Sequence, residues 1–127
     1  MLFRSVLYGQ FFYTSSILMA VFWLAVIPLL ILAYYAAYLY NFRFPGLGRA
    51  GAAVVGLALL LFLGIAFLYT NNMTLMLDPR RWSVYFANPR GTVLNLGDPA
   101  LIPRYLHFVL GAAAVGGLFV ALFGRIK

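Results

Sequence analysis

Residues 50–77 read AGAAVVGLALLLFLGIAFLYTNNMTLML and contain no charged side chain. Two other stretches are similar: residues 5–42 carry no charge, and in residues 105–124 the only ionisable groups are a tyrosine and a histidine. A helix needs about 20 consecutive apolar residues to cross the hydrocarbon core of a bilayer, so each stretch is long enough. The sequence therefore predicts an all-α, polytopic integral membrane protein that forms one transmembrane domain, with spans near residues 14–40, 50–70 and 104–123.

The composition supports this class and excludes others. Hydrophobic residues make up 65% of the 127 residues and charged residues only 9%, whereas soluble domains have roughly 25% charged residues. The net charge of +7 does not indicate a nucleic-acid partner, because the basic residues flank the apolar runs, as they do in helices anchored at lipid headgroups. The chain has no cysteine, which excludes disulfides, thiolate metal ligands and covalently attached haem within it.

The connection between the second and third spans, residues 71–103, is the longest and contains two helix-start signals. Asp78-Pro79 and Asp98-Pro99 each combine an N-cap residue with proline at the first helical position. After the first pair, aromatic rings recur at the spacing of one helix face, at Trp82, Tyr85 and Phe86. We therefore predict a short amphipathic helix over residues 78–87 that lies in the membrane interface and turns these rings towards lipid or a neighbouring subunit.

Proline and small residues predict how the spans bend and pack. Pro28 lies within the long first span and is the expected kink site, since it lacks a backbone donor. Pro103 is expected to start the third span. Small residues allow two helices to approach closely, so we expect the helix contacts to concentrate on five of them: Ala52, Gly56, Gly111, Ala114 and Gly117.

The distribution of basic residues indicates an orientation. With three spans, the amino terminus and the 71–103 loop lie on one side of the membrane. Four cations crowd into short segments on the other side: Arg43, Arg49, Arg125 and Lys127. Because basic residues near helix ends favour the cytoplasmic side, we expect the long loop to face outward, in a protein of the bacterial inner membrane.

His107 is the only histidine and lies just inside the third span. An ionisable group at that depth is costly and is therefore a functional candidate by default. Gly111 lies one helical turn deeper and Ala114 another, which leaves a slot that a flat macrocycle or a close helix could fill. Two interpretations stay open: His107 is a metal ligand, or it is a structural residue that bonds to a loop carbonyl or reaches up to the interface.

Three further residues belong to the candidate site. Met73 and Met76 lie at the end of the second span, on the same side of the membrane as His107. Thioethers suit haem iron or Cu(I), although methionine in a membrane helix usually serves packing. Arg104, one turn before His107, could pair with a haem propionate or anchor at lipid headgroups. No aspartate or glutamate lies inside a span, so a carboxylate proton relay is not predicted.

Several motifs occur in order over residues 57–127: Trp82, Asn88-Pro89-x-Gly91, Pro103-Arg104-x-x-His107 and a glycine-rich helix that ends at Gly124-Arg125. With these motifs the stretch resembles part of the large subunit of cytochrome bd-type quinol oxidases, in which the corresponding helix carries an axial histidine of haem b. The resemblance implies that His107 binds haem b and that the preceding loop lies near a quinol. That family has many more helices, a further histidine in its first helix and carboxylates for proton delivery, so oxygen reduction by this chain alone is not expected.

A second resemblance concerns the third span, in which His107 is followed by Gly116-Gly117-Leu118. This pattern is similar to membrane proteins of copper export and to related small haem-binding membrane proteins. It implies that His107, with Met73 and Met76, could handle copper.

Three functions follow as expectations. The first is a membrane subunit of an electron-transfer complex that holds haem b through His107, with Met73, Met76 or a residue of another chain as the sixth ligand, and passes electrons between quinone and partner subunits. The second is a non-catalytic membrane anchor or assembly subunit, and the third is a copper-handling protein. In each case we expect lipid and other membrane or peripheral subunits as partners rather than an isolated monomer.

Overall fold

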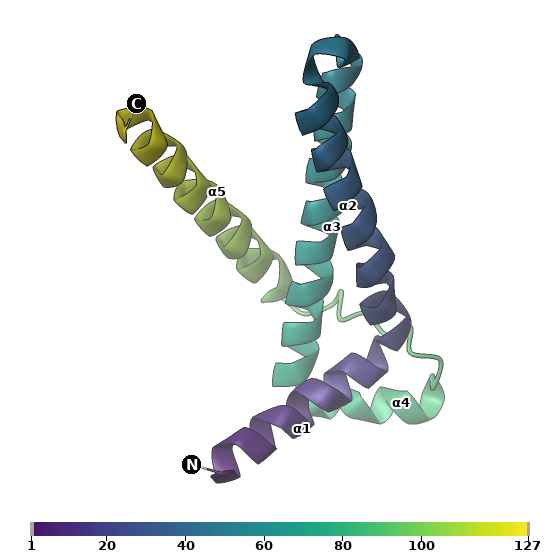
Figure 1. Ribbon diagram of the computed structural model, residues 1–127. Helices are drawn as coiled ribbons and strands as arrows, with labels where there is room; N and C mark the ends of the chain where they lie inside the picture. The colour runs from purple at the N-terminus through teal and green to yellow at the C-terminus, as the bar shows by residue number, and fades with distance from the viewer. Residues whose placement is uncertain (1, 127) are drawn as a thin grey trace.

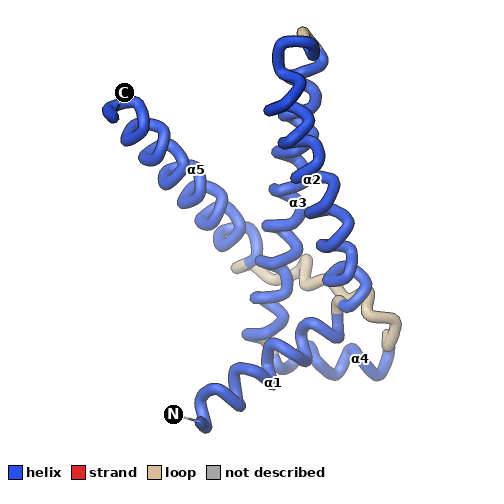
Figure 2. The backbone as a smooth tube through the Cα atoms, viewed as in Figure 1, coloured by secondary structure: helices blue, strands red, loops and turns tan. Residues whose placement is uncertain are grey.

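The computed structural model describes residues 2–126, and the side chains of all of these except residues 2–8, 44, 45 and 47. The described chain consists of helices joined by turns and one longer loop, without β-strands (Figures 1 and 2). Three stretches are long and apolar enough to cross a membrane: Ala20–Arg43, Ala50–Leu77 and Leu101–Ile126. This confirms an all-α, polytopic membrane protein with three spans. The elements in order are α1 (Leu2–Leu18), α2 (Ala20–Leu47), α3 (Ala50–Leu77), the 3-10 helix η1 (Pro79–Ser83), α4 (Val84–Ala87) and α5 (Leu101–Ile126).

The predicted first span, residues 14–40, is interrupted in the structure. α1 ends at Leu18, and Met19 leaves the helical conformation with φ −117° and ψ 35° before α2 begins. α1 then runs across the lower end of the α2–α3 pair (Figure 1). α2 continues through Pro28, the expected kink site, and the helix is interrupted at Met19, where no break was expected.

A distant backbone segment stabilises this break. The Leu18 carbonyl at the end of α1 accepts a hydrogen bond from the Val93 N–H at 3.0 Å, and the Val21 N–H at the start of α2 donates to the Gly91 carbonyl at 3.0 Å. Helix ends leave such groups without intrahelical partners, so a broken helix needs partners from elsewhere. Residues 91–93 of the long loop supply them.

The second and third spanning helices are longer than predicted. α3 continues to Leu77 rather than ending near residue 70, and its last turns are buried against the loop, with Leu75 fully covered. α5 begins at Leu101 rather than at Pro103. The first four N–H groups of a helix have no intrahelical acceptor, so a proline in the first turn costs no hydrogen bond.

α2 and α3 lie side by side as a helical hairpin (Figure 1). Gly51 and Ala58 are the buried small residues of α3, and they lie two turns apart on one face of the helix. The contacts predicted at Ala52 and Gly56 are not made within the described chain: Ala52 is exposed, and a Cβ built at Gly56 meets nothing within 4 Å. The packed face of α3 is rotated relative to the predicted one.

The predicted surface helix is present as η1 followed by α4, beside α1 (Figure 1). Tyr85 and Phe86 are exposed, as predicted, with Phe86 at 88%. Trp82 is not turned outward, which corrects the prediction: its ring packs 5.2 Å from that of Phe11, and its Nε1–H donates to the Leu75 carbonyl at 3.0 Å. That carbonyl would ordinarily accept from the residue four positions on, which is Pro79 and has no N–H. Trp82 therefore takes the place of the missing helical donor.

The apolar core lies at this end of the molecule. Leu18, Met19, Leu75 and Val93 form a buried cluster, and Phe22, Leu68, Trp82 and Leu94 pack around it. α5 adds little to it: the helix touches α3 near its start and then diverges (Figures 1 and 2). Every described residue from Leu110 to Ile126 is exposed.

Candidate functional site

His107 lies on the side of α5 that faces away from α3. The neighbouring Tyr105 faces α3, where its hydroxyl donates to the Leu63 carbonyl at 3.2 Å and its ring packs against Phe67 with the centroids 5.5 Å apart. Two residues rotate an α-helix by about 200°, so His107 lies on the opposite side. Its imidazole is exposed and makes no hydrogen bond within the described residues; its ring lies 6.0 Å from that of Phe108, centroid to centroid.

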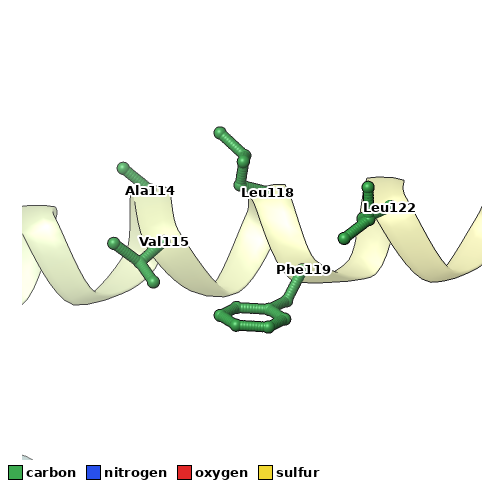
Figure 3. A pocket seen from close by; sticks show the side chains of 5 residues that line it. All are labelled: Ala114, Val115, Leu118, Phe119 and Leu122. Atoms are coloured by element: carbon green, nitrogen blue, oxygen red, sulfur yellow. The ribbon is translucent and has the colours of Figure 1, made fainter.

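The small residues after His107 form no closed slot with the rest of the described chain. Gly111 is exposed, and a Cβ built on it would meet nothing within 4 Å. Ala114 and Gly117 are also exposed, so the helix contacts expected at these three positions are not made within this chain. α5 instead carries a shallow apolar hollow of about 230 Å³, which begins two turns beyond His107 at Ala114 (Figure 3). Its walls are Ala114, Val115, Leu118, Phe119 and Leu122.

The structure does not bring Met73 or Met76 to His107. The bond between the Tyr105 hydroxyl and the Leu63 carbonyl places this part of α5 level with Leu63 of α3. Met73 follows Leu63 by ten residues, so it lies about 15 Å away from that level along the axis of α3. Two axial ligands must touch the same iron atom, so this separation excludes a pair formed by His107 and Met73 of one chain. Met76 lies still further along α3, in a hollow of about 170 Å³ with Phe11, Leu77 and Pro79.

Arg104 is half-buried and lines a polar pocket of about 290 Å³ at the loop end of α3 and α5. The pocket also holds Arg81 and both acidic residues of the chain, Asp78 and Asp98. Its remaining walls are Thr74, Leu77, Asn95, Gly97, Pro99 and Ala100. Arg104 therefore lines this pocket, and it lies three residues before His107, which places the two on neighbouring positions of the α5 surface.

A buried polar cluster adjoins the pocket. Asn71, Thr74 and Asn95 are each 0% exposed. The Asn95 N–H donates to Asn71 Oδ1 at 3.0 Å, and Asn95 Nδ2 donates to Thr74 Oγ1 at 3.2 Å and to Asp98 Oδ2 at 3.3 Å. Asp98 Oδ1 accepts from the Ala100 N–H at 2.7 Å, in the turn before α5. These bonds tie the long loop to α3 and fix the position from which α5 starts.

Several buried atoms of the cluster lack a hydrogen-bond partner: Asn71 Nδ2, Asn72 Oδ1 and Asn95 Oδ1. A buried polar atom without a partner costs about 1–3 kcal/mol, so its retention points to a ligand, a water or a specific structural need. Sequence analysis missed this cluster. The available signal was three polar residues, Asn71, Asn72 and Thr74, at the end of an otherwise apolar run.

Among the described residues, no group of three or more histidine, cysteine, aspartate or glutamate side chains is arranged to hold a metal ion. No protein-family model, curated protein or solved structure matches the chain.

Proposed function

We propose that this chain is a membrane-embedded subunit of an electron-transfer complex, in which His107 is one axial ligand of a haem b bound between α5 and another subunit. The observation that carries the proposal is an exposed imidazole without a hydrogen bond on an apolar spanning helix. A polar side chain facing hydrocarbon is costly, and ligation of the neutral imidazole to iron removes that cost.

The surface around His107 fits one side of a haem pocket. Gly111 and Ala114 leave open space on the same side of α5, and the adjoining hollow is apolar. The chain supplies one ligand and not two, because Met73 and Met76 lie elsewhere. The sixth ligand and the opposite wall would therefore come from the partner. Arg104 is not needed in this arrangement, since it lines the polar pocket.

A haem b supplies reversible one-electron transfer, and its potential depends on the axial ligands and on burial. Membrane quinone and partner subunits are the proposed electron donor and acceptor. Within this arrangement the chain orients the imidazole: the contact between Tyr105 and Leu63 sets the depth of His107, and the exposed face of α5 accepts the partner.

The test is a reduced-minus-oxidised spectrum of the complex purified from native membranes. His107→Ala should abolish the haem b absorbance, and His107→Met, which keeps a ligand, should retain haem with a shifted potential. Met73→Leu and Met76→Leu serve as controls and should leave the spectrum unchanged. Unchanged haem b stoichiometry in His107→Ala would eliminate the ligand role.

A non-catalytic anchor or assembly subunit is the second candidate, and the unpacked α5 favours it as well. In that case the chain should co-purify with its partners while His107→Ala changes neither spectrum nor composition. A copper site built from His107, Met73 and Met76 gains no support, because these side chains do not meet. Location in a bacterial inner membrane, with the long loop outward, is part of the proposal.

A further inference from the structure

The polar pocket between α3 and α5 concentrates charge in a chain that has little. The sequence contains only two acidic residues, and both line this pocket together with two arginines. The walls include Leu77 in the last turn of α3 and Arg104 in the first turn of α5. Because both helices are membrane spans, the pocket lies where a span ends, at the depth of lipid headgroups.

The charged groups in the pocket do not neutralise one another in pairs. No ion pair joins Asp78, Arg81, Asp98 or Arg104. The Arg81 guanidinium lies close to the loop backbone, since a Cβ built at Gly97 would come within 3.2 Å of its Nη2. The Asp78 carboxylate makes no capping hydrogen bond, although Asp78 precedes η1. Two cations and at least one carboxylate are therefore available to a ligand.

Asn95 fixes the polar wall of the pocket. Its side chain is 0% exposed and lies in the wall of the pocket. Both hydrogen bonds of Nδ2 go to other pocket residues, Thr74 and Asp98, whereas Oδ1 has no partner.

An apolar hollow of about 520 Å³ lies further along the same two helices. Its walls are Leu59, Phe62, Leu63 and Ala66 of α3 and Phe108, Val109, Ala112 and Ala113 of α5. Phe108 follows Arg104 by one helical turn, and Ala66 precedes Thr74 by about two turns, so the hollow lies deeper in the membrane than the polar pocket, on the far side of the contact between Tyr105 and Phe67. The wedge that opens between α3 and α5 is visible in Figure 1.

We propose that this pocket and hollow together bind a phospholipid whose headgroup is phosphoethanolamine. The phosphate would be held by Arg81 and Arg104, because guanidinium groups match phosphate oxygens. The primary ammonium would donate to Asp78, and an acyl chain would fill the apolar hollow. This inference is independent of the proposed haem.

The pocket chemistry selects this headgroup over others. A metal cation would face two arginines, and a purely anionic headgroup would face two aspartates, whereas a zwitterion matches both signs. A choline headgroup has no N–H to donate to the Asp78 carboxylate. The pocket volume of about 290 Å³ equals that of about ten waters, which accommodates the headgroup.

The experiment measures lipid binding to the delipidated full-length protein by native mass spectrometry. The probes are dihexanoyl phosphatidylethanolamine, phosphatidylcholine and phosphatidylglycerol, which share their acyl chains and differ only in the headgroup. We expect the ethanolamine lipid to bind about tenfold more tightly than either of the others, the size of one charge-assisted hydrogen bond. Equal affinities for the three lipids would overturn the proposal.

Adjacent arginines provide a matched pair of variants. Arg81→Gln should weaken ethanolamine-lipid binding about tenfold, whereas Arg80→Gln, which removes the same charge from an exposed position outside the pocket, should not. Asp78→Asn should remove the preference for ethanolamine over choline while phosphatidylglycerol still binds, which also shows that this variant is folded. Identical effects of Arg80→Gln and Arg81→Gln would refute the phosphate site.

Soluble glycerophosphoethanolamine tests whether the pocket binds a membrane lipid or a soluble compound with the same headgroup. It carries the same phosphate and ammonium without acyl chains. We expect it to bind much more weakly than the dihexanoyl lipid, because the apolar hollow stays empty. Equal affinity of the soluble compound and the lipid would overturn the assignment to a membrane lipid.

Discussion

Gly91→Ala should destabilise the fold strongly. Gly91 has φ +70°, and its carbonyl accepts the Val21 N–H that is exposed where the helix breaks. A Cβ at this position would lie 3.0 Å from the Ala20 Cβ and 3.3 Å from the Ala20 nitrogen. The neighbouring atoms include backbone, so they cannot move aside as the end of a flexible side chain would.

Two terms set the magnitude of this effect. A left-handed backbone conformation costs a residue with a side chain about 1–2 kcal/mol. Overpacking of the contact with Ala20 adds about 1–3 kcal/mol, since either α2 or the crossing loop must shift. Together they predict a loss of about 2–5 kcal/mol in the free energy of unfolding.

The assay is reversible unfolding in mixed detergent micelles, in which the fraction of the denaturing detergent is raised stepwise. It can be followed by tryptophan fluorescence, because Trp23 and Trp82 are half-buried near the two sides of the break. Gly64→Ala is the matched control: a Cβ there meets nothing within 4 Å in the middle of α3. Helix propensity predicts that this control is neutral or stabilised by up to about 1 kcal/mol. If Gly91→Ala unfolds at the same detergent fraction as Gly64→Ala, the account of the break is refuted.

Two further predictions follow from the fold. Trp82→Phe should lower the free energy of unfolding by about 1 kcal/mol, because the Leu75 carbonyl loses its indole donor. Tyr85→Phe is the control, and equal unfolding curves for the two variants would contradict the role of this hydrogen bond. The cysteine-free sequence permits a test of orientation: a membrane-impermeant maleimide applied to intact cells should label Pro89→Cys and not Ala50→Cys, and the reverse pattern would invert the proposed topology.

The three spans could be predicted because their cause is composition. Charge-free runs long enough to cross the bilayer are visible without any knowledge of tertiary contacts. The break at Met19 could not be predicted, because no glycine or proline occurs there and the stabilising partners are Gly91 and Val93, far along the chain. Pro28 carried the stronger local signal, yet α2 continues through it. Membrane helices tolerate proline where neighbouring groups satisfy the freed carbonyl.

For the candidate site as well, the sequence predicts some features and not others. His107 could be found from sequence because a lone imidazole inside an apolar run is rare and costly. The side of α5 on which His107 lies depends on which α5 residues contact α3. Tyr105 is the contacting residue because its hydroxyl donates a hydrogen bond to the Leu63 carbonyl, and the sequence does not reveal this pairing. The polar pocket depends on pairings such as that between Asn95 and Asn71, which a linear pattern does not specify.

The uneven packing of the spans explains why α5 can carry a shared site. In a bilayer, apolar side chains are already out of water, so burying them between helices brings no hydrophobic gain. Helices therefore associate only where small residues, hydrogen bonds or close packing hold them together. The start of α5 has such contacts at buried Leu101 and at Tyr105, which fix the depth of the helix. From Leu110 on, every described residue is exposed, so the outer half of α5 can lie against lipid or another subunit at little cost. His107 lies close to the fixed end but faces the free side, so its depth is set by this chain while its partner can be supplied by another.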